Sequence, residues 1–199
     1  MAKHSIRSEE TRSRILEAAG ESFADHGYDG TGVAEICTRA GISKGALYHH
    51  FTGKQHIFLE LLDEWIKELQ RALERIRSEA GSVPEAIFNM VAMTSEVFQA
   101  TEGQVPLFLE FLTKAVREPE IWHAAAAPYK QFRSFFSHLV RDGIEEGSLK
   151  PVDPEEISKI IVSFAVGLVI QGVFDPFSAD WVKVGQEGMR IIIGKLQKE

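Results

Sequence analysis

The amino-acid sequence predicts an all-α protein. Apolar residues recur at three- and four-residue spacing along most of the 199 residues, which is the period of a half-buried helix. Residues that start helices (Ser or Asp caps, proline at the first turn) and residues that end them (glycine, proline) separate these stretches. No segment alternates with a period of two and no repeat is present, so neither a sheet protein nor a repeat array is expected.

The first predicted helix runs from Ser8 to Gly27. Ser8 is the expected N-cap, because its hydroxyl can accept a backbone N–H that has no partner in the first turn. Ile15, Ala19 and Phe23 lie four residues apart and form the inner face. This helix is expected to support the two short helices that follow it.

Two short helices joined by a glycine turn are predicted for the segment TGVAEICTRAGISKGALYHHF, residues 31–51. Thr31 is the expected N-cap of the first and Ser43 of the second, and Gly41 can adopt the left-handed conformation that ends a helix. Ile36, Cys37 and neighbours form one apolar stripe. Helix, turn, helix is the layout that places a second, recognition helix in a DNA major groove.

The rest of the chain predicts six more helices. Each is bounded by cap or breaker residues, such as Ser82-x-x-Glu85 and Asp153-Pro154. The first is expected to open at the capping box of residues 52–55 and to run to about residue 78. The next are expected over 82–102, 106–117, 120–146 and 154–174, and the last follows Asp180.

Residues 12–65 resemble the DNA-binding end of the TetR/AcrR (tetracycline-repressor-like) family of transcriptional regulators. The resemblance rests on IL-x-AA-x-x-x-F, GY-x-x-T and E-I-x-x-x-AG-x-SKG-x-LY-x-HF, in that order, followed by a lysine before the next helix. It implies an N-terminal three-helix bundle with a helix-turn-helix in residues 1–53. It also implies a C-terminal helical ligand-binding and dimerisation domain in residues 54–199.

The resemblance assigns DNA contacts to two groups of residues. Those expected to face DNA are Ser43, Lys44, Gly45, Tyr48 and His49, and those expected to touch flanking phosphates are Thr31, His50 and Lys54. Hydroxyl, imidazole and ammonium groups suit phosphate oxygens, and lysine also reaches guanine. The alternative is an ordinary solvated helix face.

The charge distribution favours nucleic-acid binding at the N-terminal end. The net charge of −7 arises entirely in residues 57–199, because residues 1–56 contain seven basic and seven acidic side chains. No acidic residue occurs from Thr38 to His56, where Arg39, Lys44 and Lys54 are basic. A phosphate backbone is therefore expected to bind at this end alone.

Catalytic, metal and cofactor sites are not predicted. The sequence has no glycine-rich phosphate loop, nucleophile elbow or His-Glu-x-x-His. His49 and His50 are adjacent, so they point to different sides of a helix and cannot chelate one ion together. Cys37, the single cysteine, lies in an apolar stripe, where a buried small hydrophobe is favoured over a redox sensor.

Aromatic residues concentrate in the C-terminal helices, and the family resemblance implies an effector pocket there. The expected pocket residues are Trp65, Phe108, Glu110, Phe111, Trp122, Phe132, Phe136, Phe164 and Gln171. A small hydrophobic effector fits such a lining. Core packing with surface polar residues is the alternative for each residue.

The last two helices are the predicted dimer interface. The residues expected to line it are Phe164, Leu168, Trp181, Val184, Gly185, Gly188, Met189 and Ile192, since small residues let helices approach closely. Burial within one chain is the alternative. The apolar run from Ile160 to Ile170 is judged too short to span a bilayer, so no membrane partner is expected.

The sequence thus predicts a cytoplasmic, homodimeric regulator, a repressor, that binds a palindromic double-stranded DNA operator and is released by an effector. A ligand-binding protein whose DNA-binding unit has lapsed is one alternative. A helical enzyme is another, although no site supports it.

Overall fold

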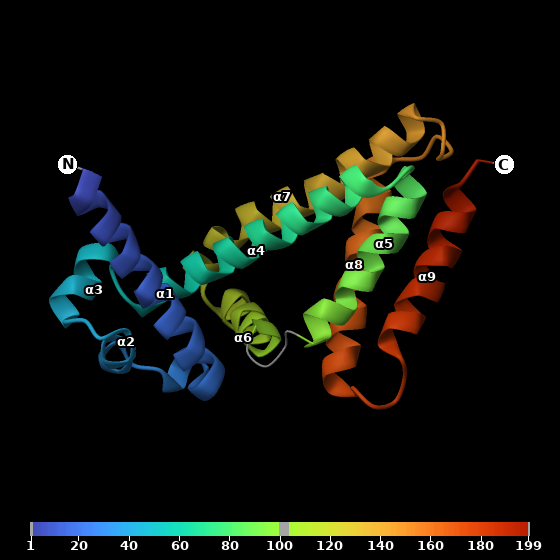
Figure 1. The fold of residues 1–199 in the computed structure, drawn as a ribbon. Helices are drawn as coiled ribbons and strands as arrows, with labels where there is room; N and C mark the ends of the chain where they lie inside the picture. The colour runs from blue at the N-terminus through green and yellow to red at the C-terminus, as the bar shows by residue number, and fades with distance from the viewer. Residues whose placement is uncertain (1, 100–103, 199) are drawn as a thin grey trace. The chain divides into compact units, whose positions relative to one another are not determined.

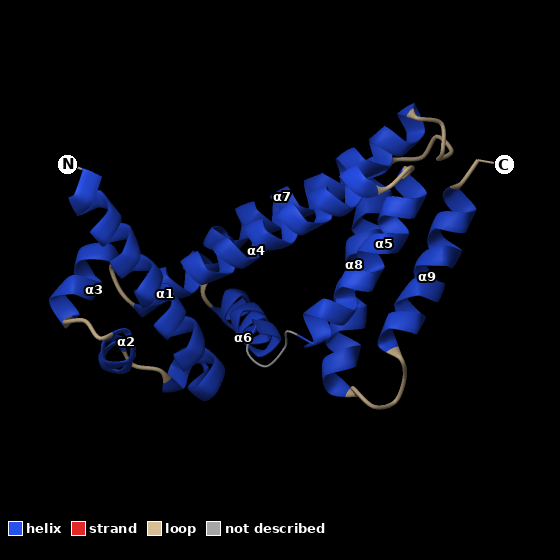
Figure 2. Cartoon of the chain, viewed as in Figure 1, coloured by secondary structure: helices blue, strands red, loops and turns tan. Residues whose placement is uncertain are grey.

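The computed structural model describes residues 2–99 and 104–198, and these form nine helices (Figures 1 and 2). The predicted all-α class is confirmed. The helices are α1 (Ala2–Gly30), α2 (Val33–Ala40), α3 (Lys44–His50), α4 (Lys54–Glu79), α5 (Val83–Gln99), α6 (Gln104–Arg117), α7 (Pro119–Glu145), α8 (Pro154–Phe174) and α9 (Trp181–Leu196).

The chain contacts divide it into two compact units. The first consists of Met1–Trp65 with Thr101–Ala126, and the second of Ile66–Ala100 with Ala127–Glu199. The first unit thus includes α6 as well as the helix-turn-helix. The predicted division into 1–53 and 54–199 follows the sequence motif rather than these contacts, and it stays a prediction.

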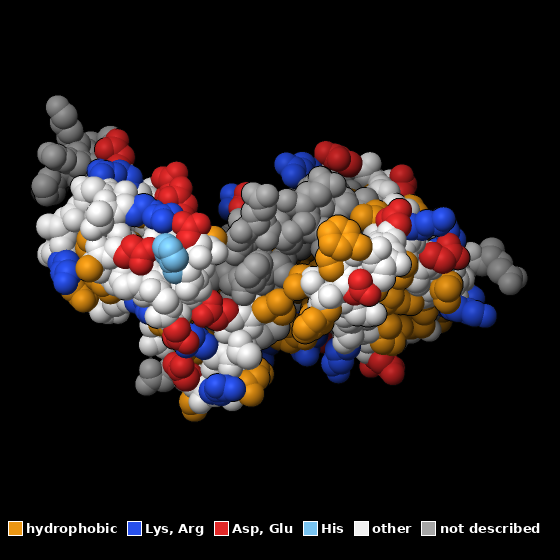
Figure 3. All heavy atoms as spheres, turned by 90° about the horizontal axis from the view of Figure 1, so that it is seen from below, with side chains coloured by type: hydrophobic (Ala, Val, Ile, Leu, Met, Phe, Trp, Pro, Cys, Tyr) orange, Lys and Arg blue, Asp and Glu red, His pale blue; other side chains and the backbone are white. Residues whose placement is uncertain are grey.

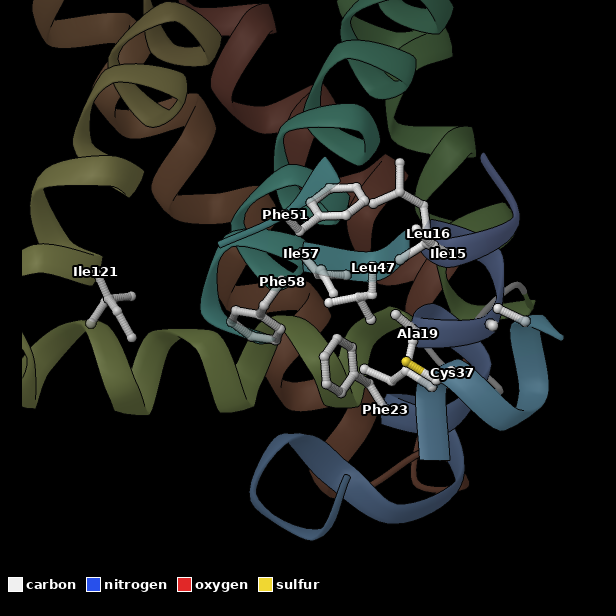
Figure 4. Close-up of a cluster of buried hydrophobic side chains, with 14 residues drawn as sticks. Ile15, Leu16, Ala19, Phe23, Cys37, Leu47, Phe51, Ile57, Phe58 and Ile121 are labelled. Atoms are coloured by element: carbon white, nitrogen blue, oxygen red, sulfur yellow. The ribbon is translucent and has the colours of Figure 1, made fainter. Parts of the chain in front are cut away.

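The core of the first unit lies between α1, the two short helices and the start of α4. Phe23, Leu47 and Phe58 point into it from three of these helices (Figure 4). Cys37 lies in the same core, as its interpretation as a small hydrophobe predicts. This packing buries one face of each short helix, which could not stay folded alone.

Helix ends in the first unit follow the predicted residues with two differences. Gly41 is left-handed (φ 64°) and ends α2, and the Ser43 side chain accepts the N–H of Ala46 at the start of α3, both as predicted. The N-cap of α2 is Gly32, however, not Thr31. The first helix begins at Ala2 rather than Ser8, and its regular geometry breaks at Gly27 (φ 70°, ψ 170°).

The second unit is built around α5, which packs against both α8 and α9. Close approach depends on Gly185, since a Cβ there would lie 2.9 Å from Val91 Cγ1 and 3.0 Å from Leu168 Cδ1. A Cβ on Gly188 would overlap the ring of Phe164. These glycines therefore serve helix packing within the chain.

Helix α8 is longer than the apolar run that the sequence analysis considered. The helix has 21 residues and contains an 18-residue window of mean hydropathy 2.0, so by length and composition alone it could cross a membrane. The prediction concerned only the shorter run from Ile160 to Ile170. The contacts of α8 with α5 and α9 place Ile161, Val162 and Leu168 among buried side chains. Of the apolar window as a whole, 28% is buried.

Candidate nucleic-acid interface

Helix α3 exposes the polar face that the sequence predicted. Leu47 is fully buried and anchors the helix on the core, whereas Tyr48 is 56% exposed. Ser43, Lys44, Gly45 and His49 are exposed as well. One face is thus fixed to the scaffold and the other is open to a partner.

The turn before α3 is stabilised from α1. The guanidinium of Arg14 donates to the carbonyls of Ala40 and Gly41, the latter at 3.4 Å. These carbonyls end α2 and have no partner in the helix, so a cation there also matches the helix dipole. Sequence reasoning missed this contact, because nothing local to residues 31–51 indicates it.

Cations of the helix-turn-helix differ in how they are used. Arg39 binds Asp25 at 2.7 Å and Glu21 at 3.4 Å, both on α1. Lys44 has no hydrogen-bond or ion-pair partner among the described residues. It is therefore the cation of α3 that remains available to a phosphate or a guanine.

Thr31 is buried within the first unit. It is 1% exposed, and its hydroxyl donates to the carbonyls of Ser22 and Gly27, both at 2.8 Å. The prediction of a phosphate contact for Thr31 does not match this burial. The hydroxyl instead ties the end of α1 to the start of α2.

Lys54 is bound within the chain too. Its ammonium donates to the carbonyl of Tyr28 at 2.6 Å and to that of Thr31 at 2.9 Å, and lies 4.2 Å from the centre of the Tyr28 ring. The main contacts of the ammonium are thus these two backbone carbonyls and not the predicted phosphate. His50 is half-buried, with its ring centre 5.2 Å from that of His49.

Helix α6 contacts the turn between α1 and α2, at Tyr28 and Asp29. The Glu110 carboxylate accepts the N–H of Tyr28 at 2.7 Å and that of Asp29 at 3.4 Å. Lys114 binds Asp29 at 2.8 Å and lies 4.7 Å from the centre of the Tyr28 ring. Glu110, predicted as a pocket residue, is thus engaged by the backbone of the helix-turn-helix unit.

The pKa values of Asp29, Lys114 and Tyr28 are shifted by their contacts with one another and by burial. The hydrogen bond from Lys114 holds the pKa of the Asp29 carboxyl below its ordinary value, and the same bond raises the pKa of Lys114. Burial raises the pKa of the Tyr28 hydroxyl, which Lys114 partly opposes. At neutral pH the Asp29 carboxylate is therefore negative, the Lys114 ammonium positive and the Tyr28 hydroxyl neutral.

The other predicted pocket residues fall in both units. Half-buried Trp65 and exposed Trp122 belong to the first unit with Glu110. The second contains Phe132, Phe136 and Phe164, which pack in or against its core, and exposed Gln171. The side chains of Phe108 and Phe111 lie outside the described ones. The pocket stays a prediction.

The predicted dimer residues separate into two groups. Leu168, Gly185 and Met189 are buried within the chain, so the alternative of intrachain packing holds for these three. Val184 is exposed, and Phe164, Trp181, Gly188 and Ile192 are half-buried. The exposed large apolar residues of the second unit, most of which the prediction did not include, are Tyr129, Ile160, Val173, Phe174, Phe177, Val184 and Ile191.

Two family models match the chain. Residues 15–61 match the model described as bacterial regulatory proteins, tetR family. Residues 84–184 match the model described as BetI-type transcriptional repressor, C-terminal. The chain belongs to the TetR family. It is a TetR-family transcriptional regulator, and the exposed α3 face is in the helix-turn-helix segment of that match.

Relatives and solved structures agree with this TetR-family assignment. The HTH-type transcriptional regulator UidR of Escherichia coli K12 is 27% identical over 163 residues, which cover 80% of each chain. A Saccharomonospora viridis protein in complex with choline has a TM-score of 0.78 at 21% identity, covering 96% of this chain and 100% of that one. The transcriptional regulator FadR from Bacillus subtilis, in complex with stearoyl-CoA, has a TM-score of 0.76 at 18% identity, covering 93% and 99%.

The TetR family is one of DNA-binding regulators. Within the residues that the structure describes, no group of three His, Cys, Asp or Glu side chains is placed to hold a metal ion.

Proposed function

We propose that this TetR-family chain is a cytoplasmic, homodimeric repressor. Each protomer inserts α3 into a major groove, and a two-fold axis spaces the pair about 34–36 Å apart to match a palindromic operator. A small hydrophobic effector lowers operator affinity by binding more tightly to a state that fits the operator poorly.

One observation carries the DNA-binding part of this proposal. The α3 face of Ser43, Lys44, Tyr48 and His49 is exposed on a helix whose opposite residue, Leu47, is fully buried. The side chains on that face donate to phosphates and base edges, and Gly45 leaves room for close backbone approach. A rigid anchor with an open polar face is what specific groove contact requires.

Homodimerisation is supported by the surface of the second unit. Phe174 is 82% exposed and Phe177 is 97% exposed, at the end of α8 and in the following loop. Figure 3 shows hydrophobic side chains gathered over one face of this unit. A contiguous apolar surface of this kind is typical of a protein interface, and a second copy is the partner that a palindrome requires.

An effector is supported by relatives of the same fold. Choline is bound in one solved structure and stearoyl-CoA in another. These ligands differ in charge and size, so the shared fold does not select one chemical class. The apolar composition of the helices after α5 favours a hydrophobic effector for this chain.

A second candidate is a ligand-binding protein without operator affinity. It is favoured by the internal pairing of Arg39 and Lys54, which removes two of the three cations of the segment from ready phosphate contact. The two candidates differ in one measurable property, the ratio of specific to non-specific DNA affinity.

Selection of genomic fragments with the purified full chain at stated salt, followed by footprinting, tests the proposal. We expect enrichment of a short palindrome protected in half-sites about one helical turn apart or somewhat more. Weak, salt-sensitive binding without enrichment would favour the second candidate. Loss of operator affinity with a panel of hydrophobic ligands then tests the effector.

A further inference from the structure

The turn of residues 27–31 joins α1 to α2 and behaves as a separate helical turn. Gly27 is not helical, but its carbonyl accepts the N–H of Thr31 at 3.2 Å, which closes one turn. The break deprives the next N–H groups of the acceptors that a continuous helix would give them. Those N–H groups need partners from elsewhere in the chain.

Glu110 supplies these partners from 82 residues away. Its two carboxylate oxygens accept the N–H groups of Tyr28 and Asp29, and both lie 3.5 Å from where a Cβ on Gly27 would be. A carboxylate at the N-terminal end of a turn also matches the positive end of its dipole. Helix α6 therefore caps one end of the turn.

Lys54 caps the other end from α4. Its ammonium binds the carbonyls of Tyr28 and Thr31, which are the acceptors at the C-terminal end. The ring of Tyr28 contacts Lys54 and Lys114 and packs 4.7 Å from the ring of Phe58. The turn is thus fixed by charges from two helices that lie outside the helix-turn-helix.

The turn leads directly into α2. Gly32, the residue after Thr31, is the N-cap of α2, and Gly41 then leads to α3. No side chain caps α2 at Gly32, so the start of α2 depends on the preceding turn. The turn therefore fixes the point at which the chain enters α2, whose buried face packs on the core.

We propose that Glu110 and Lys114 of α6 are positioning residues for operator binding. They act through the turn 27–31 and touch no DNA themselves. Loss of these contacts lowers specific operator affinity while the protein stays folded. This inference rests on the proposed function, because it assigns a control point to the same DNA-binding surface.

The sign of the charge change separates positioning from simple electrostatics. Glu110→Gln and Asp29→Asn each remove a negative charge, which by itself would strengthen binding to a polyanion. A positioning role predicts the opposite, a loss of operator affinity. Lys114→Gln removes a positive charge, and Arg117→Gln makes the same change on an exposed residue of α6 three positions further on, without contact to the turn.

The experiment measures operator affinity, non-specific DNA affinity and thermal stability of each full-length variant, with amide exchange of residues 27–36. We expect Glu110→Gln to weaken operator binding about five- to 150-fold, with faster exchange at Tyr28 and Asp29 and with non-specific binding no weaker than that of the parent. Lys114→Gln should lose up to about fivefold, since exposed pairs are weak. Asp29→Asn added to Lys114→Gln should give no further loss.

Several results would overturn the inference. One is unchanged or stronger operator binding by Glu110→Gln, and another is an equal loss for Arg117→Gln and Lys114→Gln. A loss of affinity matched by collapse of the thermal transition would show a purely structural role. If the parent chain enriches no DNA, the proposed function fails first and takes the inference with it. If the parent binds its operator tightly and the variants bind equally tightly, only the inference fails and the proposed function stands.

Discussion

The ammonium of Lys54 donates a hydrogen bond of 2.9 Å to the backbone carbonyl of Thr31. The family resemblance implies phosphate contacts for both residues, yet the structure joins them to each other at the end of the turn before α2. A buried hydroxyl and an engaged ammonium stabilise the unit that presents α3. In this structure both residues therefore serve the fold of the first unit.

Substitution of Lys44 and of Lys54 should have different consequences. Lys44→Gln should lower affinity for all DNA sequences and reduce the slope of log affinity against log salt by about 1 per protomer. Stability should change by less than about 0.5 kcal/mol, because the side chain is exposed. Titration of labelled DNA at several salt concentrations measures the slope.

Lys54→Gln should instead lower stability. Loss of a charged donor to two carbonyls costs about 1–3 kcal/mol, which thermal or urea unfolding detects. A change in salt slope as large as that of Lys44→Gln, with unaltered stability, would show that Lys54 binds phosphate after all.

Replacement of Gly27 should destabilise the first unit. Its φ of 70° and ψ of 170° belong to a region that only glycine adopts readily, so Gly27→Ala should cost about 1–3 kcal/mol. Gly32→Ser is the matched control, since φ is −105° there and nothing lies within 4 Å of a Cβ. It should stabilise by a few tenths of a kcal/mol through a new cap, roughly as helix caps do. Chemical denaturation compares the two, and equal effects would contradict the assignment.

The two faces of α3 should separate stability from DNA binding. Leu47→Ala should cost about 2–5 kcal/mol of stability, because it leaves a cavity in the core. Tyr48→Ala should change stability by less than about 0.5 kcal/mol but weaken operator binding by about 1–3 kcal/mol. Unfolding curves and operator titrations give both values, and wild-type affinity in Tyr48→Ala would argue against α3 as the reading helix.

Substitution of Phe174 and Phe177 should shift the protein from dimer to monomer. Both rings are exposed in the protomer, so replacement by serine leaves its fold intact while removing apolar area from the proposed interface. Sedimentation over a concentration series measures the dissociation constant, which should rise about tenfold or more for the double variant. The control variant is Val116→Ser, which changes an exposed apolar residue on α6. An unchanged constant would place the interface elsewhere.

Acid stability should depend on Glu146. Partial burial raises the pKa of its carboxyl, but bonds from Ser148, the N–H of Val83 and Arg77 outweigh this, and the pKa lies below the ordinary value of 4.5. A lowered folded pKa means that its stabilisation is present above pH 4.5 and is lost as the pH falls through the folded value.

Glu146→Gln should therefore lower the melting temperature at neutral pH and approach the parent at low pH. Melting curves between neutral pH and about pH 3 test this, as carboxylates titrate in that range. The exposed neighbour Glu145 gives the control variant Glu145→Gln. A constant difference between parent and Glu146→Gln at every pH would contradict the linkage.

Local signals in the sequence sufficed for the helices. Gly41, Ser43 and Asp153 each act on the backbone within a few residues, so their caps could be predicted and are confirmed. The exposed face of α3 followed from helical period, because Gly45 and His49 lie two positions either side of Leu47 and so fall on the opposite side of the helix. These properties depend on neighbours along the chain.

Contacts between distant segments could not be predicted in the same way. The family resemblance implied phosphate contacts for Thr31 and Lys54, and Glu110 was expected in a pocket because it is a polar residue near an apolar stripe. The partners of Lys54 and Glu110 lie on segments 23 and 82 residues away. Helical period does not encode such pairings.

The sequence by itself determined the helical class, the family and the exposed polar face of α3, since each depends on short-range spacing and local backbone preference. The tertiary structure decided which charged and small residues are engaged within the fold and which stay exposed. It placed Glu110 and Lys54 at opposite ends of one turn and Gly188 beneath Phe164. The physical reason is that backbone groups exposed by a helix break, and space left by a missing Cβ, are filled by whichever distant segment packs against them.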